Sequence, residues 1–383
     1  MQAAIALHKC EGMKTSSYRE TQKYRTLLLS QTPILDVRAP MEFARGAIPS
    51  AVNIPIMKDS ERNQVGICFR KHGRDAAITL GHQIVHGSHQ EERIEQWTNY
   101  LYRHPNAVLC CARGGLRSTI SQRWLADTGL HCPTVSGGFK AIRQFLSNFL
   151  SDYCSHNSFI VLSGMTGTGK TAAIKQLSRA IDLEGAANHK GSSFGRPLDQ
   201  QPSQISFENR IAVDLLLITE KANFPVVVED ESRMIGACQL PPYLKDSMHR
   251  SSVAVIEMPF EERLERLWSE YIVERYNQTI ARYPSDSKSH FANHLIDSLM
   301  RIRKRLGGVK TKRILRLLNL ALQKQEQDGF ALHRTWLAEV TRGYYDPMYA
   351  YQLDKKQDRI EFRGSASEVA QWLRLRTENP ARI

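Results

Sequence analysis

Residues 164–171 constrain the fold of this chain more than any other stretch. They read Gly-Met-Thr-Gly-Thr-Gly-Lys-Thr and come one serine after an apolar run at 159–162. A glycine, four residues and then Gly-Lys-Thr is the P-loop pattern, which forms between a buried strand and a helix. Its backbone N–H groups surround phosphate oxygens, its lysine neutralises them, and its hydroxyl holds Mg²⁺. The pattern predicts an α/β domain with a diphosphate site made by Gly164, Thr166, Gly167, Gly169, Lys170 and Thr171.

Three acidic residues follow a later apolar run of the same predicted domain. Residues 225–228 are Pro-Val-Val-Val, and Glu229, Asp230 and Glu231 come directly after them. A P-loop protein places the carboxylate that orients Mg²⁺, or a water bound to it, at this kind of strand end. The sequence does not distinguish among the three residues, and a solvated strand end is the alternative interpretation.

A second loop, within residues 108–118, combines a thiol with two glycines and two arginines. Apolar residues before it predict the end of a buried strand, and residues 122–125 predict part of a helix after it. Backbone N–H groups gathered by such a loop, with the positive end of the helix, attract an anion and lower a thiol pKa. Cys110 is predicted to be an inert core residue, and the alternative interpretation gives both cysteines that role. We predict Cys111 as the nucleophile and, as its anion site, Arg113, Gly114, Gly115, Arg117 and Ser118.

The net charge of +13 and the pI of about 9.4 indicate a polyanionic partner. Within residues 301–316 there are eight basic residues and no acidic one. A solvated helix face is the alternative, but with the overall charge this run favours an RNA phosphate footprint. The predicted RNA-binding residues are Arg301, Arg303, Lys304, Arg305, Lys310, Lys312, Arg313 and Arg316.

The length of 383 residues predicts about two domains. A polar stretch at 148–158 suggests the boundary, which gives a leader at 1–24, domains at 25–148 and 158–285, and a basic helical extension at 286–383. Seven cysteines without framework spacing indicate reduced thiols in the cytoplasm, and no pair has zinc-ligand spacing, so no metal site of protein ligands is predicted. No apolar run spans a bilayer, so no membrane partner is expected. The oligomeric state stays open.

Residues 36–43 and 46–55 and the pair Gly137-Gly138 resemble the segments that define the rhodanese fold. The resemblance implies a parallel-sheet domain with crossover helices. Asp36, Arg38 and Glu42 are expected to form a structural, ion-paired turn. Two positions depart from the pattern: Ala47 stands where rhodaneses often carry histidine, and five residues rather than four separate the predicted nucleophile from the second arginine. The longer loop suits a larger, tetrahedral anion, and phosphatases of this fold also use five.

With a rhodanese-like domain followed by a P-loop domain, the chain resembles the bacterial tRNA 2-selenouridine synthases over about residues 25–375. Membership implies that wobble 2-thiouridine becomes 2-selenouridine through an S-geranyl intermediate. The implied substrates are tRNA, geranyl diphosphate and selenophosphate, with no tightly bound cofactor and Mg²⁺ as a further option. We expect selenophosphate in the loop of Cys111, with this residue as nucleophile or selenium carrier, and the diphosphate in the P-loop.

Three alternatives from other classes stay open at this point. The spacing of cysteine, five residues and arginine is also that of a rhodanese-fold cysteine phosphatase. The P-loop domain is compatible with an RNA-stimulated NTPase that carries the first domain as a regulator. A non-catalytic RNA-binding protein is the third alternative.

Overall fold

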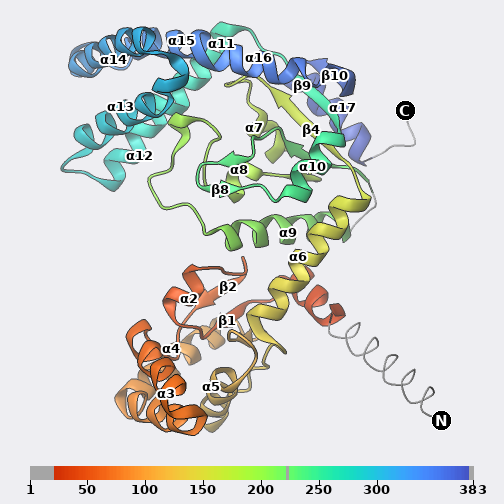
Figure 1. Ribbon diagram of the computed structural model, residues 1–383, viewed down its shortest axis with the longest axis vertical. Helices are drawn as coiled ribbons and strands as arrows, with labels where there is room; N and C mark the ends of the chain where they lie inside the picture. Colours follow the sequence, from red (N-terminus) through yellow and green to blue (C-terminus); the bar gives the residue numbers. More distant parts are fainter. Residues whose placement is uncertain (1–20, 221–223, 379–383) are drawn as a thin grey trace. The chain divides into compact units, whose positions relative to one another are not determined.

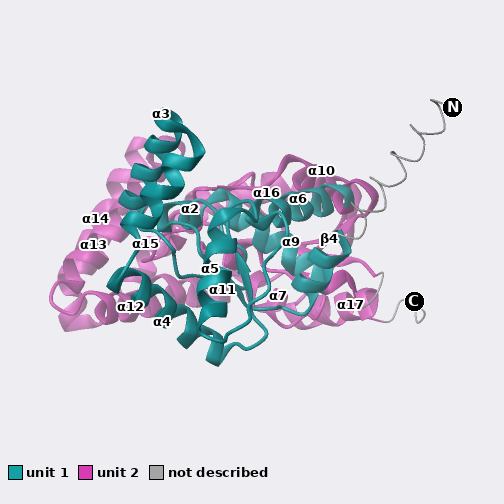
Figure 2. Ribbon diagram, turned by 90° about the horizontal axis from the view of Figure 1, so that it is seen from below, with its two compact units in different colours: residues 1–152, 203–217 teal, residues 153–202, 218–383 magenta. Residues whose placement is uncertain are grey.

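The computed structural model describes residues 21–220 and 224–378 (Figure 1). The chain forms two compact units, residues 1–152 with 203–217 and residues 153–202 with 218–383 (Figure 2). Each unit contains a parallel β-sheet, as the α/β fold class predicts. Most of the predicted leader lies outside the described residues, and residues 21–29 are helical.

The sheet of the first unit has three short parallel strands in the order β2-β1-β3, namely β1 (Ile34–Asp36), β2 (Ala51–Asn53) and β3 (Val108–Cys110). Asp36 pairs with both Asn53 and Cys110, so all three strands end at one edge, where the loop of the predicted nucleophile begins. Residues 134–136, just before the glycine pair, predict a fourth strand, but they do not form one. Only a single bridge joins Leu109 to Thr134, because the chain turns at Gly137 (φ +64°) before a second pair forms.

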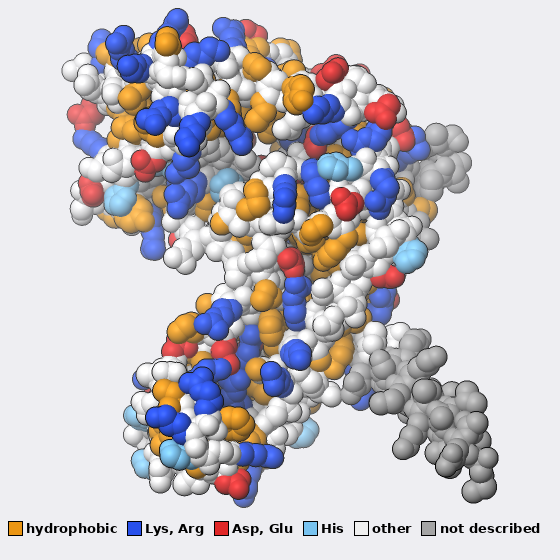
Figure 3. Space-filling view, in the orientation of Figure 1, with side chains coloured by type: hydrophobic (Ala, Val, Ile, Leu, Met, Phe, Trp, Pro, Cys, Tyr) orange, Lys and Arg blue, Asp and Glu red, His pale blue; other side chains and the backbone are white. Residues whose placement is uncertain are grey.

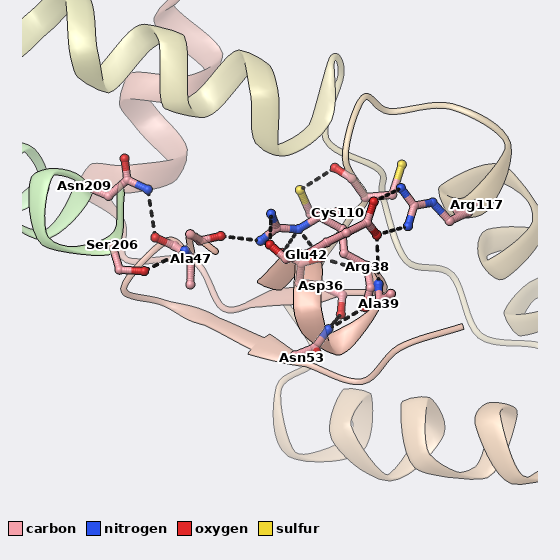
Figure 4. Close-up of polar contacts among 12 residues, drawn as sticks. Asp36, Arg38, Ala39, Glu42, Ala47, Asn53, Cys110, Arg117, Ser206 and Asn209 are labelled. Atoms are coloured by element: carbon pink, nitrogen blue, oxygen red, sulfur yellow. Dashed lines mark hydrogen bonds and ion pairs between the residues drawn. The ribbon is translucent and has the colours of Figure 1, made fainter. Parts of the chain in front are cut away.

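Helices surround this sheet: α2 (Pro40–Ala44), α3 (Asp59–Ile84), α4 (Ser88–Arg103), α5 (Leu116–Asp127) and α6 (Gly138–His156). Gly73 interrupts α3 with φ +83°, so α3 consists of two helical halves. The predicted boundary stretch 148–158 is mostly helical, because α6 continues to His156. Most of α9 (Gln204–Glu220), expected in the P-loop domain, groups with the first unit, where Asn209 donates to the carbonyl of Ala47 at 2.8 Å (Figure 4).

A buried ion pair fixes the turn after β1, as expected. Arg38 Nε donates to Asp36 Oδ2 at 2.8 Å, and Arg38 Nη2 donates to the carbonyl of Gly46 at the same distance (Figure 4). The guanidinium also lies 3.8 Å from the ring centroid of Phe139. A buried charge with this many partners holds its surroundings in one geometry, and breaking the pair is strongly destabilising.

The second unit has a five-stranded parallel sheet in the order β10-β9-β4-β6-β5. Its strands are β4 (Phe159–Gly164), β5 (Ala180–Ile181), β6 (Val226–Glu229), β9 (Ser252–Ile256) and β10 (Ile360–Gly364). A small antiparallel pair, β7 (Met234–Ile235) and β8 (Cys238–Gln239), lies outside it. The order changes direction at the fully buried β4, and ligands bind at the carboxyl ends of strands at such a switch point.

The helices of the second unit are α7 (Lys170–Lys175), α8 (Leu183–Ala186), α10 (Pro242–Arg250), α11 (Phe260–Trp268), α12 (Arg275–Arg282), α13 (Ser287–Leu306), α14 (Gly308–Asp328), α15 (His333–Val340), α16 (Asp346–Asp354) and α17 (Ala366–Glu378). The helical stretch predicted from Ser287 onward is confirmed. It has its own core, in which Phe291, Leu318 and Trp336 are fully buried. Among the described helices, none combines the length and apolar character that crossing a membrane requires.

Candidate anion-binding sites in the two units

Cys111 is the first residue after β3 and lies in a ring of hydrogen-bond donors. Its side chain is 3% exposed, and its Sγ lies 3.2 Å from the hydroxyl oxygen of Ser118. Burial alone raises the pKa of the Cys111 thiol, but the Ser118 hydroxyl and the N–H groups of Arg113, Ser118 and Gly115 together lower it below its usual value. The loop therefore stabilises a thiolate, the form in which cysteine is a nucleophile.

The neighbouring Cys110 has the opposite environment. Its side chain is 1% exposed, and its Sγ donates to the carbonyl of Cys111 at 3.4 Å (Figure 4). Burial and the nearby carboxylate of Asp36 raise the pKa of the Cys110 thiol well above its usual value. This contrast supports the assignment of the nucleophile to Cys111.

The start of α6 holds the thiol loop in shape from outside. The backbone N–H of Phe139 donates to the carbonyl of Cys111 at 2.8 Å. A Cβ atom on Gly138 would lie 2.3 Å from the same carbonyl oxygen, and one on Gly114 would lie 2.8 Å from the nitrogen of Gly137. Gly138, the second glycine of the pair noted in the sequence, is thus required for this close approach of two backbones, as is Gly114.

Contrary to expectation, the side chain of Arg117 does not point to the anion site beside the thiol. It pairs with Glu42, with Nη1 contacting Oε2 and Nη2 lying 3.3 Å from Oε1 (Figure 4). Burial raises the pKa of Glu42, but Arg117, the backbone N–H of Ala39 and Arg62 outweigh it and lower the pKa. Glu42 was expected to be structural only. An anion in the loop would compete with this carboxylate for the guanidinium.

A pocket of about 490 Å³ opens beside the sulfur of Cys111. The thiol loop supplies Arg113, Gly115 and Arg117 to its lining. Ser118 lies against the sulfur, and Gly114 has a backbone role. The structure therefore brings all the predicted residues of this site together, although Arg117 faces Glu42.

The P-loop forms between β4 and α7, where the sequence places it. Gly169 ends the loop with φ +83°, and Lys170 Nζ donates to the carbonyls of Gly164 and Met165 at 2.8 and 3.3 Å. A pocket of about 250 Å³ has a lining that includes Thr166, Gly167, Gly169, Lys170 and Thr171. Further cations reach this pocket from elsewhere in the unit, namely Lys175, Lys190 and Arg266.

Three carboxylates, of which Glu229 and Glu231 are buried and Glu184 is partly buried, lie near the P-loop end of α7. Thr171 donates to Glu184 Oε2 at 2.8 Å, and the N–H of Glu184 donates to Glu229 Oε2 at 3.1 Å. Burial raises the pKa values of all three carboxyls, and nearby acids raise them further: Asp182 acts on Glu184, and Glu184 acts on both Glu229 and Glu231. Sequence reasoning missed Glu184, because the four-residue helix α8 carries no recognisable pattern.

The structure separates Asp230 from the other two acids of the predicted triplet. Its carboxylate pairs with Lys356 and accepts from the hydroxyl of Ser163 at 2.6 Å. Burial raises the pKa of Asp230, but Lys356, Ser163 and Lys245 outweigh it and lower the pKa. Asp230 is thus an ionised partner of lysine, whereas Glu229 and Glu231 belong to the carboxylate group beside the P-loop.

The donor set beside the P-loop fits Mg²⁺, which prefers oxygen ligands and keeps several waters. The hydroxyl of Thr171 and the carboxylates of Glu184 and Glu229 supply oxygens, and Glu229 Oε1 is buried without a hydrogen-bond partner. Within residues 21–220 and 224–378, no group of three or more acidic, histidine or cysteine side chains is arranged to hold a metal ion alone. A cation here would therefore also need phosphate oxygens or water.

Comparisons with known proteins match both units. Residues 20–145 match the family model described as "Rhodanese-like domain", and residues 157–380 match "tRNA 2-selenouridine synthase AAA domain". A protein of Marinobacter nauticus named tRNA 2-selenouridine synthase is 44% identical over 94% of this chain and 99% of its own length. The chain belongs to the tRNA 2-selenouridine synthase family. Proteins with the same name from Pseudomonas syringae pv. syringae and Hahella chejuensis are each 45% identical, over 93% and 92% of this chain and 98% and 93% of their own lengths.

In this member of the family, the predicted basic residues lie on α13 and α14, and all eight are exposed. Lys and Arg side chains are prominent over these helices in Figure 3. Arg301 Nη2 donates to the hydroxyl of Ser298 at 2.8 Å, and Arg313 pairs with Glu339 at 2.5 Å, so these two are partly engaged within the unit. The opposite faces of both helices are apolar and buried, with Leu299 as an example.

Proposed function

We propose that this protein converts 2-thiouridine at the wobble position of tRNA into 2-selenouridine through an S-geranyl intermediate. Geranyl diphosphate and selenophosphate are the small substrates, and the reaction takes place in the cytoplasm. Membership of the synthase family supports the overall conversion. The observation that carries the proposal is the buried thiol of Cys111, whose pKa is lowered inside a ring of N–H donors. Such a site suits a small tetrahedral anion and an attacking thiolate.

Selenophosphate is assigned to the thiol loop of the first unit. The N–H groups of Arg113, Gly115 and Ser118 point at the sulfur, so they also surround an anion bound against it. Arg117 adds a guanidinium that can leave Glu42 for a bidentate contact with the selenophosphate oxygens. The positive N-terminal end of α5, which has twelve residues, favours the same anion.

Geranyl diphosphate is assigned, through its diphosphate, to the P-loop of the second unit. Lys170 already lies among the loop carbonyls and would exchange them for phosphate oxygens. Thr171 with Glu184 and Glu229 would hold Mg²⁺, which neutralises a leaving diphosphate. A diphosphate site needs no nucleotide hydrolysis, so the P-loop here serves substrate binding.

The two steps balance as substitutions. In the first, the sulfur of 2-thiouridine attacks the geranyl carbon, a C–S bond forms, the C–O bond breaks, diphosphate leaves, and the base gives its N3 proton to water. In the second, selenium bonds to C2 of the base, the C2–S bond breaks, and geranylthiolate leaves and takes up a proton. Water finally converts the phosphoryl group of selenophosphate to phosphate.

For Cys111 we propose attack on phosphorus rather than transport of selenium. The thiolate forms an S–P bond, the P–Se bond breaks, and hydrogen selenide anion is released next to C2 of the base. Water then hydrolyses the S–P bond and restores the thiol. A perselenide on Cys111 would require the removal of two electrons, and neither substrate accepts them. The five-residue spacing to Arg117, shared with phosphatases, matches attack on a tetrahedral phosphorus.

The eight basic residues of α13 and α14 are proposed to bind tRNA phosphates. Their exposure in one stretch and the net charge of +13 support this assignment.

The test is mass spectrometry of nucleosides from 2-thiouridine tRNA incubated with the protein, geranyl diphosphate and selenophosphate. We expect 2-selenouridine from the original chain and from Cys110→Ala, and S-geranyl-2-thiouridine without selenation from Cys111→Ala. Full selenation by Cys111→Ala would refute the role of this thiol. Unchanged 2-thiouridine, with phosphate released from an aryl phosphate, would support the phosphatase alternative instead.

A further inference from the structure

An apolar pocket of about 570 Å³ lies in the first unit beside the thiol loop. Its walls come from both halves of α3 and from the beginning of α5. Arg113, Gly115, Leu116 and Arg117 line both this pocket and the pocket of Cys111, so the two share a rim. The volume is in the range of small-molecule sites, about 300–1,000 Å³.

The walls of this pocket leave hydrocarbon in contact with water. Only Ala77 and Gly81 are buried among the 26 residues of α3. Phe69 and Leu116, both on the wall, are 56% and 42% exposed. Exposed apolar side chains gathered in a concave surface mark a ligand site. The charged residues of the lining are all basic and include Arg62, so the pocket combines a hydrocarbon interior with cations.

We propose that this pocket holds the geranyl chain of S-geranyl-2-thiouridine while selenium replaces sulfur. This inference rests on the proposed function. The geranyl sulfur is bonded to C2, the atom that selenium attacks, so the first carbon of the chain lies two bonds away from the reacting carbon. When C2 lies beside Cys111, the chain must enter a region that adjoins the thiol loop. The apolar pocket shares its rim with that loop.

The pocket would also make the selenation site selective for the alkylated base. A geranyl chain covers the side chains of Phe69 and Leu116, which otherwise face water. A 2-thiouridine without the geranyl chain buries none of this apolar surface. The pocket therefore gives the second step a preference for the product of the first.

Gly66→Leu tests the pocket without damage to the fold. Gly66 lies on α3 and lines the pocket, and a Cβ there meets only the flexible end of Arg62, at 3.8 Å. Leucine favours a helix more than glycine does, so the variant should fold at least as well. The matched control is Gln64→Leu, which adds the same side chain at an exposed position of the same helix. Phe69→Asp is a second variant, because this exposed wall residue bears little of the core.

The assay supplies the full-length protein with selenophosphate and tRNA that already carries S-geranyl-2-thiouridine. We expect Gly66→Leu and Phe69→Asp to form 2-selenouridine about tenfold more slowly or worse, and Gln64→Leu to match the original chain. All variants should still geranylate 2-thiouridine tRNA from geranyl diphosphate. Equal selenation by Gly66→Leu and Gln64→Leu would overturn the inference, as would a loss of geranylation with selenation intact. If the original chain forms no 2-selenouridine from this tRNA, the proposed function fails together with the inference.

Discussion

Replacing Ser118 by alanine should raise the pKa of Cys111 by about one unit. When the thiol is protonated, the Ser118 hydroxyl can donate to the carbonyl of Gly115, at 2.8 Å, while the thiol donates to Ser118. When the thiol ionises, the hydroxyl turns to the sulfur, so its neutral hydrogen bond to Gly115 is exchanged for a charge-assisted one. The bond donated by the thiol is lost as well, but S–H is a weak donor and changes the balance little. That exchange is worth about 1.3 kcal/mol, the difference between about 1 kcal/mol for a neutral bond and about 2.3 kcal/mol for a bond to a charged group. It corresponds to about one pKa unit, or about tenfold less thiolate below the pKa.

Thiolate absorbance measured against pH checks this value, with the titration of Cys111→Ala subtracted to isolate the signal. Burial raises the pKa values of Cys110, Cys132 and Cys154, so these thiols titrate later. The pH profile of selenation should move upward by the same amount in Ser118→Ala, and the rate should recover at higher pH. Thr119→Ala is the control, because this exposed neighbour makes only a 3.4 Å contact with Gly115. An unchanged Cys111 pKa in Ser118→Ala would refute the account of the thiolate.

Three further predictions concern the second unit. Lys170→Ala should weaken diphosphate binding at least about tenfold in calorimetry, since a charged hydrogen-bond donor is lost, and equal affinity would contradict the placement. Reversing the charges of Arg303, Arg305 and Lys312 should weaken tRNA binding. The slope of log affinity against log salt concentration should become shallower by up to about three, whereas an unchanged slope would place the footprint elsewhere. Burial and the charge of Glu184 raise the pKa of the Glu231 carboxyl. Above pH 4.5 the folded state therefore keeps the proton on Glu231, whereas the unfolded chain loses it, so the free energy of unfolding falls as pH rises. Denaturant unfolding of Glu231→Gln should show a smaller fall over this range, and parallel curves for the two proteins would contradict the reasoning.

Strands β3, β4 and β6 and the two loops could be predicted because their signals are local. An apolar run followed at once by glycines identifies β4 with its P-loop, and a shorter run identifies β3 with the thiol loop. The start of α13 at Ser287 also follows from the change in composition there. The same local reasoning produced the wrong strand at 134–136, because one apolar residue beside a turn resembles the end of a strand.

The contacts that the sequence did not reveal join residues far apart in the chain. Glu42 and Arg117 are 75 residues apart, and the contact of Ala47 with Asn209 spans 162 residues, which moved most of α9 out of its predicted domain. From the sequence alone, each of these side chains could equally well be exposed to solvent. Packing rather than pattern decides such pairs, so the arginine of the thiol loop was assigned to the anion alone.

The glycines that shape the thiol loop have a consequence for transplanting it. An added Cβ at Gly114 would meet the backbone of Gly137, whereas one at Gly115 would meet nothing within 4 Å, so the two adjacent glycines differ in the substitutions they tolerate. The curvature of the loop depends on the chain segment at the start of α6 as much as on its own residues. Grafting the loop alone onto another scaffold would therefore transfer its sequence but not its ring of N–H donors. A working graft must include Gly137 and Gly138 as well.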